Sequence, residues 1–313
     1  MMADPAPYRD DLAEGPDTQA FWLRTSDVVR IRVGHAAARD SKGTVFILPG
    51  RTEYIEKYGR NAKDFVRAGF DVVSVDWRGQ GMSDRLGANP MVGHVGRFLD
   101  FQKDWAAVIA FARRADMPRP WHMVAHSMGG CIGLRALISG SDMTSVMFTG
   151  PMWGIQMAGY LRPVAWTLPR LAMALGQGHR LAPGTSIKSY PASEPFENNL
   201  LTSDPEMFDY MRRHVEAEPQ FGLGGPSFSW LLTALQECAE LAALPSPALP
   251  ALCFVGSNER IVDTTAIRDR MTEWKGGKLL LVDGAEHEVL MENANTRRQV
   301  TGAAVSLFSS FKS

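Results

Sequence analysis

The sequence predicts an α/β fold, in which a mostly parallel sheet carries helices on both faces and a helical insertion covers one end. Three observations predict it. Short apolar runs alternate with helical patterns along most of the chain. A serine flanked by small residues follows one of those runs, and one long block in the middle breaks the alternation. A length of 313 residues with 45% hydrophobic and 21% charged residues is enough for a large core.

Composition excludes several classes of protein. A net charge of −1 with no basic stripe argues against a nucleic-acid partner. The cysteines Cys131, Cys238 and Cys253 are far apart in apolar surroundings, which predicts buried thiols in a reducing compartment. The first residues lack the basic and apolar regions of a signal peptide. Glycine and proline interrupt both uncharged runs, 143–161 and 241–258, so neither reads as a membrane span. We therefore expect a cytoplasmic protein, at most peripheral at the inner face of the membrane.

The first half of the chain reads as alternating strands and helices after a loose lead-in over residues 1–25. Residues 28–33 alternate between apolar and polar, which predicts a half-exposed strand. Continuous apolar runs are typical of parallel strands buried on both faces. The expected elements are strands at 28–33, 44–48, 71–75, 121–124 and 145–149, and helices at 55–68, 98–112 and 131–138. This order predicts right-handed crossovers in a parallel sheet.

The second half contains the break and then a return to the same pattern. From 150 to 226 the apolar residues are punctuated by glycine and proline, and only a capped helix at 203–216, beginning Ser203-Asp204-Pro205, is clear. We interpret 1–149 as the first part of the α/β core, 150–226 as a cap and 227–313 as the second part of the core. The expected later elements are helices at 227–243, 264–274 and 295–311 and strands at 251–255 and 278–282.

Ser127 is the candidate nucleophile. It follows the strand at 121–124 in Ala125-His126-Ser127-Met128-Gly129 and leads into a helix. A serine on such a strand-to-helix turn is the nucleophile elbow, which needs small residues two positions either side. Ala125 stands where glycine is usual, and Gly129 fills the second position. His126 is expected to be a packed neighbour of the serine. The pattern predicts ester hydrolysis.

The base and the acid should follow the serine in the order acid, then histidine. His287 comes just after the strand at 278–282 and is the candidate base, since the other histidines lack such a setting. Glu259 comes just after the strand at 251–255 and is the preferred acid. Asp263 is the alternative acid, although its position before Thr264 also suits a helix N-cap. Glu286 is a third, less favoured carboxylate.

The oxyanion hole should be formed by two backbone N–H groups. One would be the N–H of Met128, which follows the nucleophile. The other should come from the loop after the first buried strand, where Gly50 allows close approach of the backbone. The N–H of Arg51 is therefore the second candidate.

Several segments resemble one known family. Residues 49–58, PGRTEYIEKY, are similar to the HGxxEHxxRY segment of monoglyceride lipases, with Pro49 and Tyr54 replacing two histidines. Residues 76–83 resemble the DxRGxGxS loop of α/β-hydrolases, and 256–260 resemble their GSxDR segment with Glu259 at the aspartate position. Residues 199–204 and 224–231 are similar to cap segments of bacterial lysophospholipases. Over about 28–310 the chain thus resembles the serine aminopeptidase S33-like clade of monoglyceride lipases and lysophospholipases.

The resemblance implies the α/β-hydrolase fold and a serine ester hydrolase that cleaves monoacylglycerols or lysophospholipids. The reaction would pass through an acyl-enzyme intermediate and need no metal or organic cofactor. The Met, Leu and Trp residues of the cap would form either an acyl-chain tunnel, which is favoured because Met-rich apolar surfaces suit flexible chains, or a small core of its own. Two alternatives remain open, a prolyl-type aminopeptidase on the same fold and a non-enzymatic scaffold. The head group, the chain length and the oligomeric state are not specified by the sequence.

Overall fold

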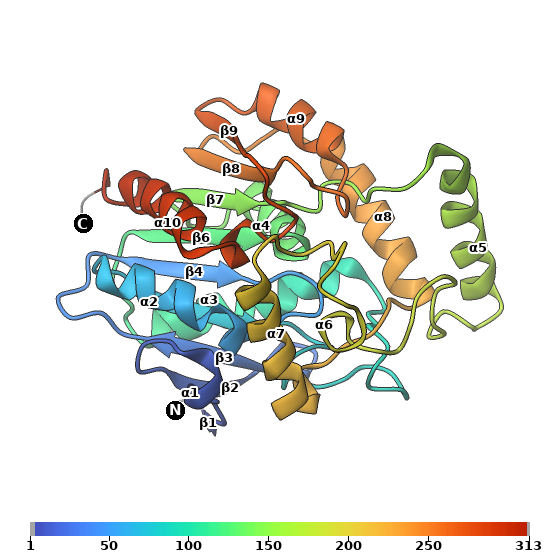
Figure 1. Cartoon of the computed structure of the whole chain (residues 1–313), viewed down its shortest axis with the longest axis horizontal. Coiled ribbons are helices and arrows are strands. Elements are labelled where there is room, and N and C mark those ends of the chain that lie inside the picture. Colours follow the sequence, from blue (N-terminus) through green and yellow to red (C-terminus); the bar gives the residue numbers. More distant parts are fainter. Residues whose placement is uncertain (1–3, 312–313) are drawn as a thin grey trace.

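A computed structural model describes residues 4–311 of the chain. Within them, nine strands form one sheet in the order β1-β2-β3-β5-β4-β6-β7-β8-β9 (Figure 1). β1, β2 and β3 pair antiparallel, as do β3 and β5, and all pairs from β5-β4 through to β8-β9 are parallel. The strands are β1 (Asp4–Ala6), β2 (Gln19–Arg24), β3 (Arg30–Ala36), β4 (Thr44–Leu48), β5 (Asp71–Asp76), β6 (Trp121–His126), β7 (Ser145–Thr149), β8 (Ala251–Gly256) and β9 (Gly277–Val282). The mostly parallel sheet predicted from the sequence is confirmed.

The expectation of a loose lead-in over residues 1–25 is wrong for the described part of that segment. β1, β2 and the short helix α1 (Asp10–Ala13) lie there, and β2 pairs with β3 along its whole length. Pairing with β1 and β3, together with burial of Ala20 and Leu23, holds β2 in place. The residues considered for a signal peptide include 1–3, which lie outside the described residues.

Helices cover both faces of the sheet because the central strands are buried on both sides. In β4, Phe46 and Leu48 pack into one hydrophobic cluster, whereas Val45 and Ile47 pack into the other. The first cluster includes side chains of α3 (Phe101–Arg114), α4 (Met128–Ile138), α8 (Phe228–Ala242) and α9 (Thr264–Glu273). The second includes side chains of α2 (Gly59–Arg67) and α10 (Ala294–Phe308). One turn of 3-10 helix precedes each of three helices, at η1 (Ile55–Tyr58), η2 (Phe98–Asp100) and η5 (Val289–Met291).

The block between β7 and α8 holds the helices of the expected cap. They are η3 (Gly159–Leu161), α5 (Arg162–Ala174), α6 (Tyr190–Ser193), α7 (Pro205–Ala217) and η4 (Pro219–Phe221). Figure 1 shows α5 at the outer edge of the molecule beyond α8, and α7 in front of the sheet beside α2. The N-cap of α7 is Asp204, whose side chain accepts from the N–H groups of Glu206 and Met207.

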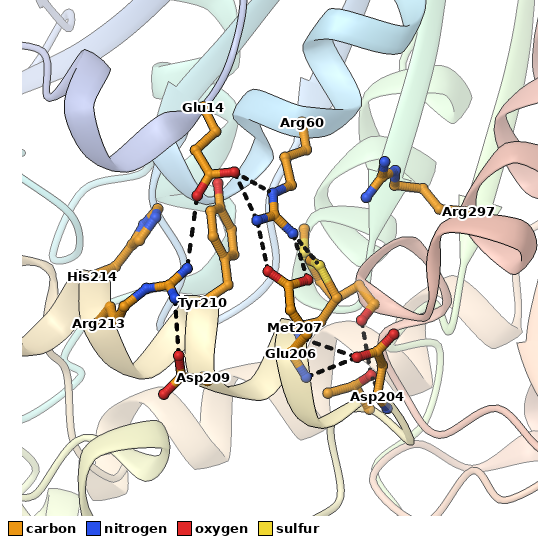
Figure 2. Close-up of polar contacts among 12 residues, drawn as sticks. Glu14, Arg60, Asp204, Glu206, Met207, Asp209, Tyr210, Arg213, His214 and Arg297 are labelled. Carbon is orange, nitrogen blue, oxygen red and sulfur yellow. Dashed lines mark hydrogen bonds and ion pairs between the residues drawn. The ribbon is translucent and has the colours of Figure 1, made fainter.

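α7 is fastened to the core by charge and by aromatic contact (Figure 2). Arg60 of α2 pairs at 2.7 Å with both Glu14 and Glu206, and its guanidinium lies 4.3 Å from the ring centre of Tyr210. The Tyr210 hydroxyl lies within hydrogen-bond distance of the carbonyl of Ala13, at 2.9 Å. This helix is therefore fixed to the N-terminal segment, whereas α5 packs mainly on α8.

Two further expectations concern the membrane and the thiols. In residues 4–311 no helix combines the length and apolar character needed to cross a bilayer. Cys131, Cys238 and Cys253 are free and buried.

Candidate active site

Ser127 stands on the turn between β6 and α4, and the turn is as cramped as the motif requires. Its φ is 49° and its ψ −117°, a conformation that residues other than glycine seldom adopt. A Cβ at Gly129 would lie 2.1 Å from the carbonyl oxygen of Leu48, so this position has to be glycine. Ala125 is accommodated because Gly133 of α4 faces it, where an added Cβ would lie 3.3 Å from the methyl group of Ala125.

Three predicted side chains meet at this turn. The Nε2 atom of His287 lies 2.9 Å from the Oγ atom of Ser127. On the other side of the ring, Nδ1 of His287 lies 2.6 Å from Oε2 of Glu259. The other carboxylate oxygen of Glu259 accepts from the N–H groups of Ile261 at 2.7 Å and Val262 at 3.1 Å. The arrangement can take a proton from the serine and stabilise the resulting imidazolium.

The pKa shifts of the acid and the base agree with this geometry. Burial acts to raise the pKa of Glu259, but the hydrogen bond and charge of His287 outweigh it, so that this pKa lies below its ordinary value. Burial acts to lower the pKa of His287, but the hydrogen bond and charge of Glu259 outweigh it, so that this pKa lies above 6.5. Burial lowers the pKa of the neighbouring His126 to about 4, which keeps that ring neutral.

The other two candidate acids lie elsewhere. Asp263 caps α9, where its Oδ1 accepts from the N–H groups of Thr265 at 3.0 Å and Ala266 at 3.4 Å. Glu286 pairs with Arg260 at 3.0 Å. Neither carboxylate contacts the imidazole of His287, so the geometry favours Glu259.

The candidate oxyanion donors lie beside the serine. A Cβ at Gly50 would lie 3.0 Å from the Cβ of Ser127, which puts the start of the Arg51 loop against the nucleophile. Within residues 4–311 the N–H groups of Arg51 and Met128 have no hydrogen-bond acceptor. Gln80 donates to the carbonyl of Gly50 at 2.7 Å and thereby holds the loop. Both N–H groups are thus free to bind an oxyanion.

A buried charge network beneath the site was missed from the sequence. Glu53 accepts hydrogen bonds from the N–H of Gly50 and from the hydroxyl of Tyr58, and Lys57 bridges Glu53 at 2.8 Å and Glu288 at 2.7 Å. Burial acts to raise the pKa of Glu53, but the charge of Lys57 and the hydrogen bonds from Lys57 and Tyr58 outweigh it and lower that pKa. In its anionic form Glu53 therefore holds the loop that contains Gly50 and Arg51. The family-like segment at 49–58 contains Glu53 and Lys57, and this was the available signal.

Three side chains of this network could each offer a ligand atom to a metal ion. Glu53, His126 and Glu288 offer such atoms within 4.8 Å of one another. The ammonium group of Lys57 already lies between the two carboxylates and pairs with both of them. A cation would have to displace it, so the donor set does not suit a metal ion.

A pocket of about 570 Å³ opens at Ser127. Its walls come from the loop at residues 51–53, from the block between β7 and β8, and from the segments after β8 and β9. The apolar side chains that line it are Met152, Ile155, Leu200, Leu201, Leu223, Trp230, Leu231, Ile261 and Val262. Such a wall suits an aliphatic chain next to the reacting carbonyl.

Comparison with known proteins gives a consistent result. The description "serine aminopeptidase, S33" belongs to a family profile that matches residues 39–294. Lysophospholipase L2 of Escherichia coli (strain K12) is 32% identical over 322 residues, covering 94% of this chain and 90% of that protein. A soluble variant of monoglyceride lipase from Saccharomyces cerevisiae aligns with a TM-score of 0.73 and 18% identity over 99% of both chains. A carboxyl esterase from Bacillus coagulans gives 0.74 and 16% over 94% of this chain and 98% of that one. The α/β-hydrolase fold predicted from the sequence is confirmed.

Proposed function

This chain belongs to the serine aminopeptidase S33 family, and on that premise we propose that it hydrolyses esters of lipids that carry a single acyl chain. The observation that carries the proposal is the hydrogen-bonded series Ser127–His287–Glu259 at the mouth of an apolar pocket. Two similar proteins support the same substrate class. One sequence relative is a lysophospholipase, and one structural neighbour is a monoglyceride lipase.

The reaction follows from the geometry. The Oγ atom of Ser127 attacks the ester carbonyl carbon while its proton passes to Nε2 of His287. The N–H groups of Arg51 and Met128 bind the oxyanion of the tetrahedral intermediate. As the C–O bond to the alcohol breaks, His287 returns the proton to the leaving oxygen. Water then releases the fatty acid by the same steps, and Glu259 holds the imidazole in the required tautomer throughout.

Two measurements test the proposal. A fluorophosphonate probe should label the wild-type protein but not Ser127→Ala, because the label forms on the activated hydroxyl. Hydrolysis of monoacyl esters should become faster from short to medium or long acyl chains. A wild-type protein that takes up no label would overturn the mechanism, and an optimum at acetate would remove the acyl-chain pocket.

The two rival functions are less well supported. An aminopeptidase needs a free carboxylate to hold the substrate ammonium, but two of the three carboxylates in the pocket wall, Glu53 and Glu288, are already paired with Lys57, and the third, Glu194, is exposed to solvent. The pocket wall also carries the cationic Arg51. Absence of aminoacyl-anilide cleavage would exclude this rival. A non-enzymatic scaffold would need neither the paired acid and base nor the strained serine, and labelling at Ser127 would exclude it.

We also propose that residues 150–226 act as the cap and that this cap meets a membrane surface through α5. Its outer side exposes Leu161, Val164, Leu168, Leu171 and Leu175. No aspartate or glutamate occurs between Asp142 and Glu194, whereas this stretch holds Arg162, Arg170, Arg180 and Lys188. An apolar face beside basic residues suits an anionic lipid surface. The free, buried cysteines fit a cytoplasmic enzyme at the inner face of the membrane.

A further inference from the structure

We propose that the side chain of Arg51 binds the phosphate of the substrate head group, so that the enzyme prefers lysophospholipids to uncharged monoacylglycerols. The inference rests on the proposed function, since it assigns the polar end of the same single-acyl substrate. The backbone N–H of Arg51 is assigned to the oxyanion, which leaves the side chain without a role in the reaction. Its guanidinium is a separate group of a residue that lines the same pocket.

The guanidinium of Arg51 lies in the pocket wall without an anionic partner. Its Nη2 donates to the carbonyl of Gly224, and its Cζ lies 5.2 Å from the ring centre of Trp230. Its Nε is buried and has no acceptor. In the described part of the chain no carboxylate comes within 4.0 Å of this side chain. Burial lowers the pKa of Arg51 to about 10, and the group is still a cation at neutral pH.

Other buried cations of the protein are compensated, which makes Arg51 distinctive. Arg32 pairs with Glu56 and Asp76, and Lys57 pairs with two carboxylates as described. Arg85 and Arg270 lack an ion pair but donate to several carbonyl oxygens each. A buried guanidinium with one carbonyl acceptor and an unused Nε is costly to desolvate. An anion supplied by the substrate would offset that cost.

The reach of the side chain matches the length of a lysophospholipid head. When the ester carbonyl oxygen sits on the Arg51 N–H, the ester oxygen, three glycerol carbons and a phosphate oxygen separate the carbonyl carbon from phosphorus. The same number of bonded atoms, Cα, Cβ, Cγ, Cδ and Nε, separates the Arg51 nitrogen from Cζ. The phosphate of a 1-acyl lysophospholipid can therefore lie along the guanidinium. Two N–H groups in a plane suit two phosphate oxygens.

Around Arg51 the pocket wall supplies a second cation, and two of its three carboxylates are paired with Lys57. A Cβ at Gly93 would lie 2.6 Å from Nη2, so glycine at that position makes room for the guanidinium. Lys188 lines the same pocket and adds a second, exposed cation. Glu53 and Glu288 also line it, and Lys57 pairs with both of them. Glu194 remains as an exposed carboxylate on the pocket wall.

The test compares two substrates with the same acyl chain, lysophosphatidylglycerol and 1-monoacylglycerol, by the ratio of their kcat/KM values. Arg51→Met should lower this ratio by about 10- to 100-fold, the range for losing hydrogen bonds to a charged group. Any shift of the Arg51 N–H would slow both substrates alike and cancel from the ratio. Arg51→Lys keeps the charge and should restore part of the preference. Arg85→Met is the matched control and should leave the ratio unchanged.

The outcomes separate the inference from the proposed function. A ratio unchanged in Arg51→Met, with both substrates cleaved by the wild type, overturns the phosphate site alone. A wild type that cleaves neither substrate overturns the proposed function. Dodecyl phosphate should inhibit hydrolysis of a neutral ester at least tenfold more strongly than inorganic phosphate. Equal inhibition by the two would mean that the site binds free phosphate instead of a lipid head group, and would also overturn the inference.

Discussion

Nδ1 of His287 lies 2.6 Å from Oε2 of Glu259, although the related motif carries an aspartate at that position. The longer side chain fits because its second oxygen is held by the N–H groups of Ile261 and Val262. Both oxygens of the Glu259 carboxylate are thereby fixed in direction.

Glu259→Gln should lower kcat by about four orders of magnitude, since an amide no longer stabilises the imidazolium or fixes its tautomer. Asp263→Ala should leave kcat nearly unchanged but lower the free energy of unfolding by about 1 kcal/mol, because α9 loses its N-cap. Steady-state kinetics and urea unfolding measure the two effects. If Asp263→Ala were the inactive variant, the assignment of the acid would be wrong.

The rate should rise with pH as His287 loses its proton. Because the pKa of His287 is raised, the acid limb of kcat/KM should have its midpoint above 6.5. In Glu259→Gln the residual activity should show a lower midpoint, since burial then dominates and burial disfavours the imidazolium. His126 stays neutral in this range and adds no second limb. A midpoint that does not fall in Glu259→Gln would contradict the assigned pair.

Gly129→Ala should disrupt the elbow, because the new methyl group would meet the carbonyl oxygens of Leu48 and Pro49 at 2.1 and 2.5 Å. We expect a loss of about 1–3 kcal/mol in the free energy of unfolding, together with loss of activity. Gly302→Ala in α10 is the matched control. Nothing lies within 4 Å of its added Cβ, and it should stabilise the protein by about 1 kcal/mol.

Arg60→Met should weaken the attachment of α7 in a salt-dependent way. The partners Glu14 and Glu206 are 45% and 56% exposed, so the expected loss is about 1 kcal/mol or less in urea unfolding at low salt. The difference from wild type should shrink as ionic strength rises. Arg213 pairs with Glu14 at 3.7 Å and with Asp209 at 3.0 Å, and all three side chains are exposed. Arg213→Met should therefore change the stability still less. Equal losses in both variants would contradict this ranking.

Leu171→Ser with Leu175→Ser should reduce sedimentation with anionic vesicles by at least about tenfold, because two exposed leucines no longer enter the lipid. Turnover of a water-soluble ester should not change. Leu281→Ser on the edge strand β9 removes an equally exposed leucine and serves as the control. Binding that survives the double variant would show that α5 is not the membrane contact.

The parts predicted well from the sequence are those with local signals. The apolar strands, the elbow around Ser127 and the strand-end segments holding Glu259 and His287 are each readable within a few residues, and topology then brings them to one sheet edge. β2 was missed because its sequence, Gln19–Arg24, shows no clean alternation of apolar and polar residues, and its place is set by hairpin pairing with the adjacent β3. The bridge from Lys57 to Glu288 joins residues far apart in the sequence, so no local pattern reports it. The lack of a partner for Arg51 becomes visible only in three dimensions.

The unequal attachment of α5 and α7 has a practical consequence for protein engineering. Because α7 is bound to α1 and α2 whereas α5 leans mainly on α8, variation in residues 157–190 can reshape the entrance while leaving the reaction centre and the folding core intact. Libraries for bulkier esters should therefore be built in that segment and should spare residues 204–217.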